Sequence, residues 1–231
     1  MLGLLILSVL GACTHATLER PAPRLISVRG TGRVAVKPDT AVVRVGAEAR
    51  APALAPATAD VARRSAAVIE RVKALGVAER DITTVAYAID PIAAPRRTDE
   101  DPTRIVAYRV ANVVEVKIRD LAAVGRILDE SIAAGANTIS GLQFTLDDPA
   151  PAEAQARTIA VKDAASTARQ LAAAAGVGVG ELVSLTEDAA RRPVGPMPRL
   201  AAESARLSVG PVESGQVEVV VNVEAQYLIG P

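Results

Sequence analysis

Few side chains in this sequence could carry nucleophilic or metal-assisted chemistry. The chain has one cysteine, Cys13, and one histidine, His15, and both lie near its N-terminus. A serine or cysteine nucleophile needs a base beside it, and zinc sites are built mainly from histidine and cysteine. Because the sequence from Ile26 onward contains neither residue type, we expect no catalytic, cofactor-binding or metal-ligating residue, and no cofactor.

Two groups of carboxylates are candidates for acid–base chemistry. The run Asp99–Asp101 lies in a Pro-rich stretch among several arginines, which indicates a solvated loop that neutralises its own charge. Asp147 and Asp148 stand between a predicted strand and Pro149, where a carboxylate caps the helix that follows. A paired-carboxylate site is the alternative, but nothing places either group across a cleft from another acid. We therefore expect a protein that is not an enzyme.

The segment GTGRVA at 30–35 has the glycine spacing of a dinucleotide-binding turn. Such a site needs a strand before the turn and a helix after it, with the phosphate at the helix N-terminus. Strand periodicity continues on both sides of this segment. Glycine at a bulge or at a tight strand crossing is therefore the better interpretation.

Length and composition exclude several classes of protein. The chain has 231 residues, with 26 basic and 26 acidic side chains and a formal net charge of zero. A nucleic-acid-binding protein should carry a basic excess, so no nucleic-acid partner is expected. Aromatic residues make up 2% of the chain, which argues against a site that stacks bases or sugars.

The N-terminal segment predicts export to the cell envelope. Residues 2–12, LGLLILSVLGA, are apolar and uncharged, and too few to span a bilayer as a helix. We expect a signal peptide over 1–12, an acylated Cys13 after it, and a polar tether over 13–25. A secretory signal cut after Ala16 and an N-terminal core helix are the alternatives. No Lys or Arg precedes the apolar run, which departs from the usual pattern.

Hydrophobic periodicity predicts an α+β protein, with antiparallel or mixed sheets covered by helices. Strands are expected over 26–36, 40–50, 82–89, 104–119, 138–147, 181–186 and 216–229. Helices are expected over about 57–75, 120–135 and 150–175, the last with alanine on nearly all of its packing face. We expect the first two strands to pair through a turn at Lys37–Asp39. We expect the last strand to be central and to run through its sheet or overhang it.

Several segments together resemble the SIMPL-domain family of bacterial envelope proteins. They lie at 30–46, 81–91, 108–149, 160–187 and 214–227. The most specific are Pro38-Asp39, Asp81-Ile82-Thr83-Thr84, Arg119-Asp120-Leu121 and Gly135-Ala136-Asn137. The chain departs from the family pattern at Ala107 and Thr167, which weakens any inference about oligomer geometry more than it weakens the fold.

The resemblance implies an arrangement for the domain 26–231. A ferredoxin-like subdomain is inserted between N- and C-terminal strands. On this basis, 26–90 and 176–231 form an outer subdomain and 104–175 the inserted one. The family has no agreed catalytic residues, so none is transferred.

The resemblance also implies a location and a role. It implies a periplasmic protein of the bacterial envelope that forms homo-oligomers and supports envelope or oxidative stress tolerance. With Cys13 acylated, a lipid anchor would hold it to the outer membrane, and its protein partner is unknown. The alternative is a periplasmic adaptor that binds a peptide or an envelope protein through a sheet edge and the 189–213 loop.

Replacement of Cys13 tests the anchor. Cys13→Ser removes the thiol that would carry an acyl chain, so the protein should be unprocessed or soluble in membrane fractionation. Ala16→Leu is the matched control, because a signal peptidase requires a small residue before its cut. Normal fractionation and normal N-terminal mass in Cys13→Ser, with altered processing in Ala16→Leu, would contradict the lipoprotein assignment.

Overall fold

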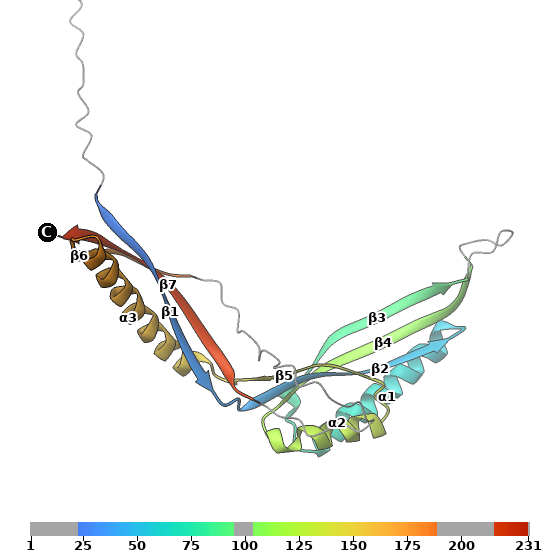
Figure 1. Ribbon diagram of the computed structural model, residues 1–231. Coiled ribbons are helices and arrows are strands. Elements are labelled where there is room, and N and C mark those ends of the chain that lie inside the picture. The colour runs from blue at the N-terminus through green and yellow to red at the C-terminus, as the bar shows by residue number, and fades with distance from the viewer. Residues whose placement is uncertain (1–22, 95–103, 189–214, 231) are drawn as a thin grey trace, which may run out of the picture.

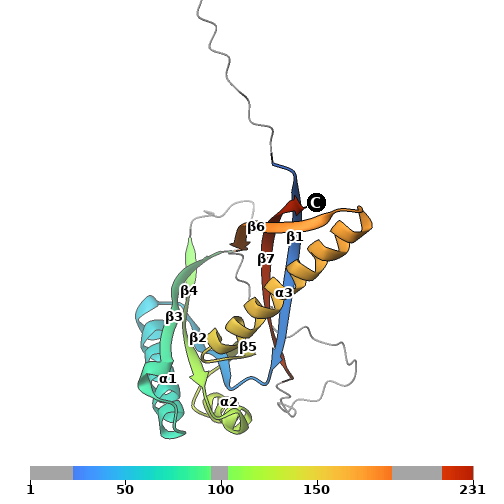
Figure 2. The same ribbon diagram turned by 90° about the vertical axis from the view of Figure 1, so that its left-hand side faces the viewer.

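The computed structural model describes residues 23–94, 104–188 and 215–230 (Figure 1). Two antiparallel sheets, each covered on one face by helix, form the two arms of an elongated molecule (Figures 1 and 2). The α+β class is therefore confirmed. Cys13, the run Asp99–Asp101 and the segment 189–213 lie outside the described residues.

The larger sheet has four strands in the order β3-β4-β2-β5. Its strands are β2 (Thr40–Ala51), β3 (Ile82–Ala93), β4 (Ile105–Ile118) and β5 (Thr138–Thr145). Its helices are α1 (Leu54–Ala74) and α2 (Val124–Ala133). The short 3₁₀ helix η1 (Glu79–Asp81) comes directly before β3, and the second one, η2 (Leu121–Ala123), comes directly before α2. The chain order of this unit is β-α-β-β-α-β.

Alternation of side chains builds the core of this sheet. Val43 and Val45 of β2 pair with Val116 and Val114 of β4, and all four point to the helix side and are buried. Together with side chains of both helices they form one apolar cluster. The opposite face carries cross-strand ion pairs such as Arg44 with Glu115 at 3.3 Å.

The smaller sheet has three strands in the order β1-β7-β6, covered by α3 (Ala150–Ala174). Its strands are β1 (Leu25–Val36), β6 (Gly178–Glu187) and β7 (Val217–Gly230). The last strand is thus central, as predicted. Leu228 pairs with Leu25 on one side and Gly230 pairs with Gly178 on the other, so among the described residues β7 does not overhang the sheet at this end.

The helix α3 rests directly on the backbone of β1. Its buried residues are alanines at every fourth position, 152, 156, 160, 164, 168 and 172. Beneath them lie Gly30 and Gly32, where an added Cβ would stand 2.1 Å from the carbonyl oxygen of Ala160 and 1.8 Å from that of Ala156. The two glycines of the 30–35 segment are therefore explained by close approach of a helix, not by a bulge or a strand crossing.

Two sequence-based expectations about connectivity are wrong. The strands β1 and β2 do not pair with each other, because β1 pairs with β7 and β2 pairs with β4 and β5. The stretch Lys37–Asp39 therefore links two sheets. The subdomain division also differs: one sheet unit runs over 40–145, while β1, α3, β6 and β7 form the other.

An alanine substitution at Gly32 tests the helix contact. Gly32→Ala places a methyl group inside the backbone of α3, so the free energy of unfolding should fall by about 1–3 kcal/mol or more. Gly125→Ala in α2 is the control, because a Cβ there meets nothing within 4 Å. That variant should be unchanged or more stable by up to about 1 kcal/mol. Equal denaturant midpoints for the two variants would contradict the contact.

Candidate functional site: a polar junction between the sheets

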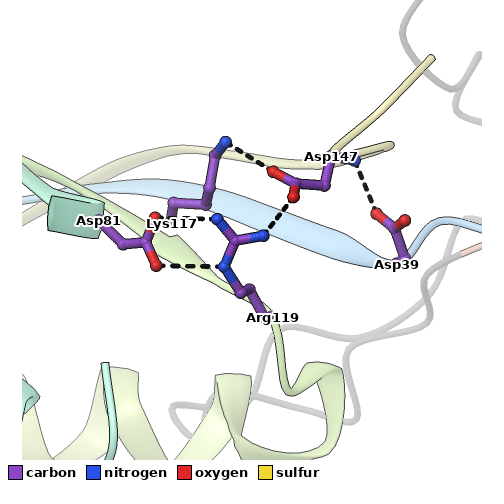
Figure 3. Close-up of polar contacts among 5 residues, drawn as sticks. All are labelled: Asp39, Asp81, Lys117, Arg119 and Asp147. Carbon is purple, nitrogen blue, oxygen red and sulfur yellow. Dashed lines mark hydrogen bonds and ion pairs between the residues drawn. The ribbon is translucent and has the colours of Figure 1, made fainter. Parts of the chain in front are cut away.

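A network of charged side chains lies where the two sheets meet (Figure 3). Arg119 follows the end of β4, and Lys117 lies within that strand. Asp81 ends η1, just before the pair of Ile82 with Val116 that starts the β3–β4 ladder. Strand pairing therefore brings Asp81 beside Arg119, although the two are far apart in sequence.

Arg119 binds two carboxylates from different segments. Its Nε and Nη2 atoms donate to the two oxygens of Asp81, both at 3.1 Å. Its Nη1 donates to Asp147, which also accepts from Lys117 Nζ at 2.9 Å. The Asp81 side chain is 8% exposed. A bidentate pair between a guanidinium and a carboxylate fixes direction as well as distance.

Backbone hydrogen bonds extend the network to the link between the sheets. The backbone N–H of Asp147 donates to Asp39 Oδ1 at 2.8 Å, and the N–H of Asp39 donates to the Thr145 carbonyl at 3.2 Å. Asp39 lies just before β2, and Asp147 lies just after β5. The network thus joins η1, the end of β4, the end of β5 and the stretch between β1 and β2.

Hydrogen bonds within the network shift the pKa of two of its groups, Asp147 and Arg119. Hydrogen bonds from Lys117 first, and then from Arg119, hold the pKa of the Asp147 carboxyl below its usual range. Hydrogen bonds to Asp81 and Asp147 raise the pKa of Arg119 above its already high value. A general acid or base needs a pKa near the working pH, and these groups have been moved away from it. The arrangement holds chain segments together, and neither Asp147 nor Arg119 is poised for proton transfer near neutral pH.

A second polar contact continues the pairing of β2 with β5 beyond its last strand pair, Gly46 with Thr138. Asn137, just before β5, accepts from the Glu48 N–H at 2.7 Å and donates to the Glu48 carbonyl at 2.8 Å. Its own N–H donates to the Gly46 carbonyl at 3.0 Å. Gly135, with a φ of +115°, ends the preceding helical turn in the left-handed region. The Gly135–Asn137 segment therefore positions β5 against β2.

The structure separates the two carboxylates that the sequence placed side by side. Asp148 Oδ1 accepts from the Ala150 N–H at 3.0 Å and so satisfies one N–H of the first turn of α3, although the N-cap residue of that helix is Pro149. The Asp147 side chain instead binds Lys117 of β4 and Arg119 just after it. Within 23–94, 104–188 and 215–230, no three His, Cys, Asp or Glu side chains gather as metal ligands would.

Sequence reasoning missed the network itself. In the sequence, Asp39, Asp81 and Arg119 stand out only as parts of specific segments, and Lys117 lies within the predicted strand 104–119. The available signal was the position of each charge at the end of a predicted element. The position of a charge identifies a candidate residue, but it does not predict which residue it contacts.

Acid titration of the unfolding free energy tests the role of Asp147. Its pKa is lower in the folded state, so the charged form stabilises the fold at neutral pH and this stabilisation is lost as the pH falls through that lowered pKa. Asp147→Asn should be less stable than the wild type at pH 7, with the difference shrinking below the ordinary pKa of 3.8. Asp129→Asn, at an exposed position of α2, is the control. A difference that does not change with pH would contradict this role.

Comparison with known proteins agrees with the resemblance seen in the sequence. The family model SIMPL, described as a protein of unknown function (DUF541), matches residues 26–227. The 26 kDa periplasmic immunogenic protein of Brucella melitensis is 34% identical over 179 residues, 76% of this chain and 70% of that protein. The uncharacterized protein YggE of Edwardsiella ictaluri is 26% identical over 174 residues, 75% of this chain and 72% of that protein. The chain belongs to the SIMPL family.

Proposed function

We propose that this protein is a non-enzymatic, lipid-anchored protein of the bacterial periplasm that self-associates and supports envelope or oxidative stress tolerance. The periplasmic location is supported by the name of the Brucella relative. The anchor is supported by the apolar run that ends at Cys13. The stress role is supported by the family resemblance. In the described part of the chain, no helix is long and apolar enough to cross a membrane.

The exposed edge strand β3 carries the proposal of self-association. It lies at the edge of the four-stranded sheet, and α1 packs mainly on β2 and β4. Three apolar side chains of β3 are consequently open to solvent: Val85 is 43%, Tyr87 57% and Ile89 43% exposed. Large apolar side chains gathered on one exposed strand are typical of an interaction surface.

The chemistry of β3 suits a second copy of the same strand. No charged residue lies between Ile82 and Ile89, and an edge strand offers its outward backbone N–H and C=O groups as a template. Asp90 binds Arg109 at 3.0 Å, and Pro91 has no N–H to donate, so pairing would end there. Two β3 strands related by a two-fold axis would extend the sheet and bring their apolar side chains side by side across the new strand pair.

The described chain starts away from the β3 edge. The described chain begins at the outer end of β1, beside the end of β7, and β3 lies in the other arm (Figure 1). A tether leaving from Leu25 would therefore not start at the β3 edge.

Charges placed on β3 test this proposal. Tyr87→Lys combined with Ile89→Lys should lower the mass in size-exclusion chromatography with light scattering to that of one chain, because two lysines would face their copies. Far-UV circular dichroism should be unchanged, since both side chains are exposed. Ile132→Lys is the matched control, because it adds a charge at an apolar α2 residue that is 49% exposed. An oligomer of unchanged mass in the double variant would place the interface elsewhere.

A further inference from the structure

Two buried polar atoms lie between α1 and the larger sheet. One is Ser65 Oγ of α1 and the other is Asn112 Oδ1 of β4, and neither has a hydrogen-bond partner among the described residues. Ser65 is only 7% exposed. Leaving such an oxygen unbonded costs free energy, so nearly all buried polar atoms of folded proteins bind another protein group or an ordered water.

Asn112 lies on the helix side of a strand that is paired along both edges. It stands opposite Ala47 of β2 and opposite Tyr87 of β3. The residues two positions before and after it, Val110 and Val114, are buried under the helices. Because side chains alternate along a strand, Asn112 points to the same side. Its amide is therefore a polar group in an otherwise apolar row of the sheet.

Ser65 uses its hydroxyl differently from the buried serine of the other helix on this sheet. Ser131 of α2 donates to the carbonyl of Ile127, one turn back, at 2.6 Å. This bond is the usual way in which a serine within a helix satisfies its hydroxyl. Within α1, Ser65 makes no such bond, and it lines a cavity between the helix and the sheet. Its hydroxyl is therefore available to a partner in that cavity.

The size and lining of this cavity fit one water molecule. The cavity has a volume of about 10 Å³, and a buried water needs about 10–15 Å³. A larger ligand is excluded by this volume. The residues that line the cavity are all uncharged, which argues against an ion. Besides Ser65 and Asn112 they are Val45, Gly46, Ala47, Val68 and Val114.

We propose that one water molecule is bound between α1 and β4 as a fixed part of the fold, donating to Asn112 Oδ1 and accepting from the Ser65 hydroxyl. Two partners lie within the range of about two to four that buried waters have. The bridge satisfies both oxygens at once and ties α1 to a central strand. It rests on different atoms from the proposed self-association, so either proposal can fail without the other.

A crystal structure of the unaltered full chain, at a resolution that shows ordered water, tests the site directly. It should show one water within about 2.7–3.2 Å of both Ser65 Oγ and Asn112 Oδ1. A Ser65 hydroxyl bonded to the carbonyl of Val61, one turn back, would overturn the proposal. So would a cavity in which no ordered water is seen.

A double-mutant cycle tests whether the two side chains share a ligand. Ser65→Ala and Asn112→Val should each raise the equilibrium constant for unfolding about tenfold, because each leaves the other oxygen with an incomplete set of bonds. The double variant removes both oxygens, so no buried group is left unsatisfied. Its unfolding constant, measured in denaturant, should be about fivefold smaller than the product of the two single effects predicts.

Ser131→Ala provides the matched control cycle with Asn112→Val. Ser131 bonds its own helix and is not among the residues that line the cavity. Its effect and that of Asn112→Val should therefore multiply to within about twofold. Multiplying effects in the Ser65 cycle, or the same coupling in both cycles, would overturn the proposal. The crystal structure needs no substitution, so a variant that fails to fold leaves that test intact.

Discussion

The guanidinium of Arg119 is the contact on which the junction between the two sheets depends. It binds Asp81 with two parallel hydrogen bonds and Asp147 with a third. Asp147 in turn donates its backbone N–H to Asp39, in the link from β1 to β2. A planar guanidinium can hold two carboxylates in fixed directions, which a lysine ammonium could not do. As a result, the C-terminal ends of β4, β5 and η1 are held close together.

The contacts of Arg119 give a structural role to the segments that resemble the family most specifically. Charged residues at such positions are often taken as catalytic, but Asp39, Asp81 and Arg119 hold each other, and Asn137 holds the backbone of Glu48. These contacts fix how the elements within the larger sheet and the link to the smaller sheet are positioned. The proposed self-association therefore uses a surface away from this network, the exposed β3 edge of the larger sheet.

The sequence was sufficient for much of the fold, because period-2 and helical patterns report which face of an element is buried. Those patterns predicted the central β7 and the alanine face of α3. They do not report which strands pair. The predicted β1–β2 hairpin is therefore wrong, because β1 pairs with β7 and β2 pairs with β4. The capping role of Asp148 follows from local sequence. The role of Asp147 depends on Lys117 and Arg119, which are brought near it only by the β2–β4 and β2–β5 ladders.

Amide hydrogen exchange in an Arg119→Met variant tests the role of the junction most directly. Loss of the guanidinium should leave the Asp147 side chain held by Lys117 alone, so the amides of Asp39 and Asp147 should exchange faster while the amides of the β2–β4 and β1–β7 ladders keep their protection. Unchanged exchange at Asp39 and Asp147 would show that Arg119 does not hold the junction. Faster exchange across both sheets would show that it supports the whole fold and not the link between them.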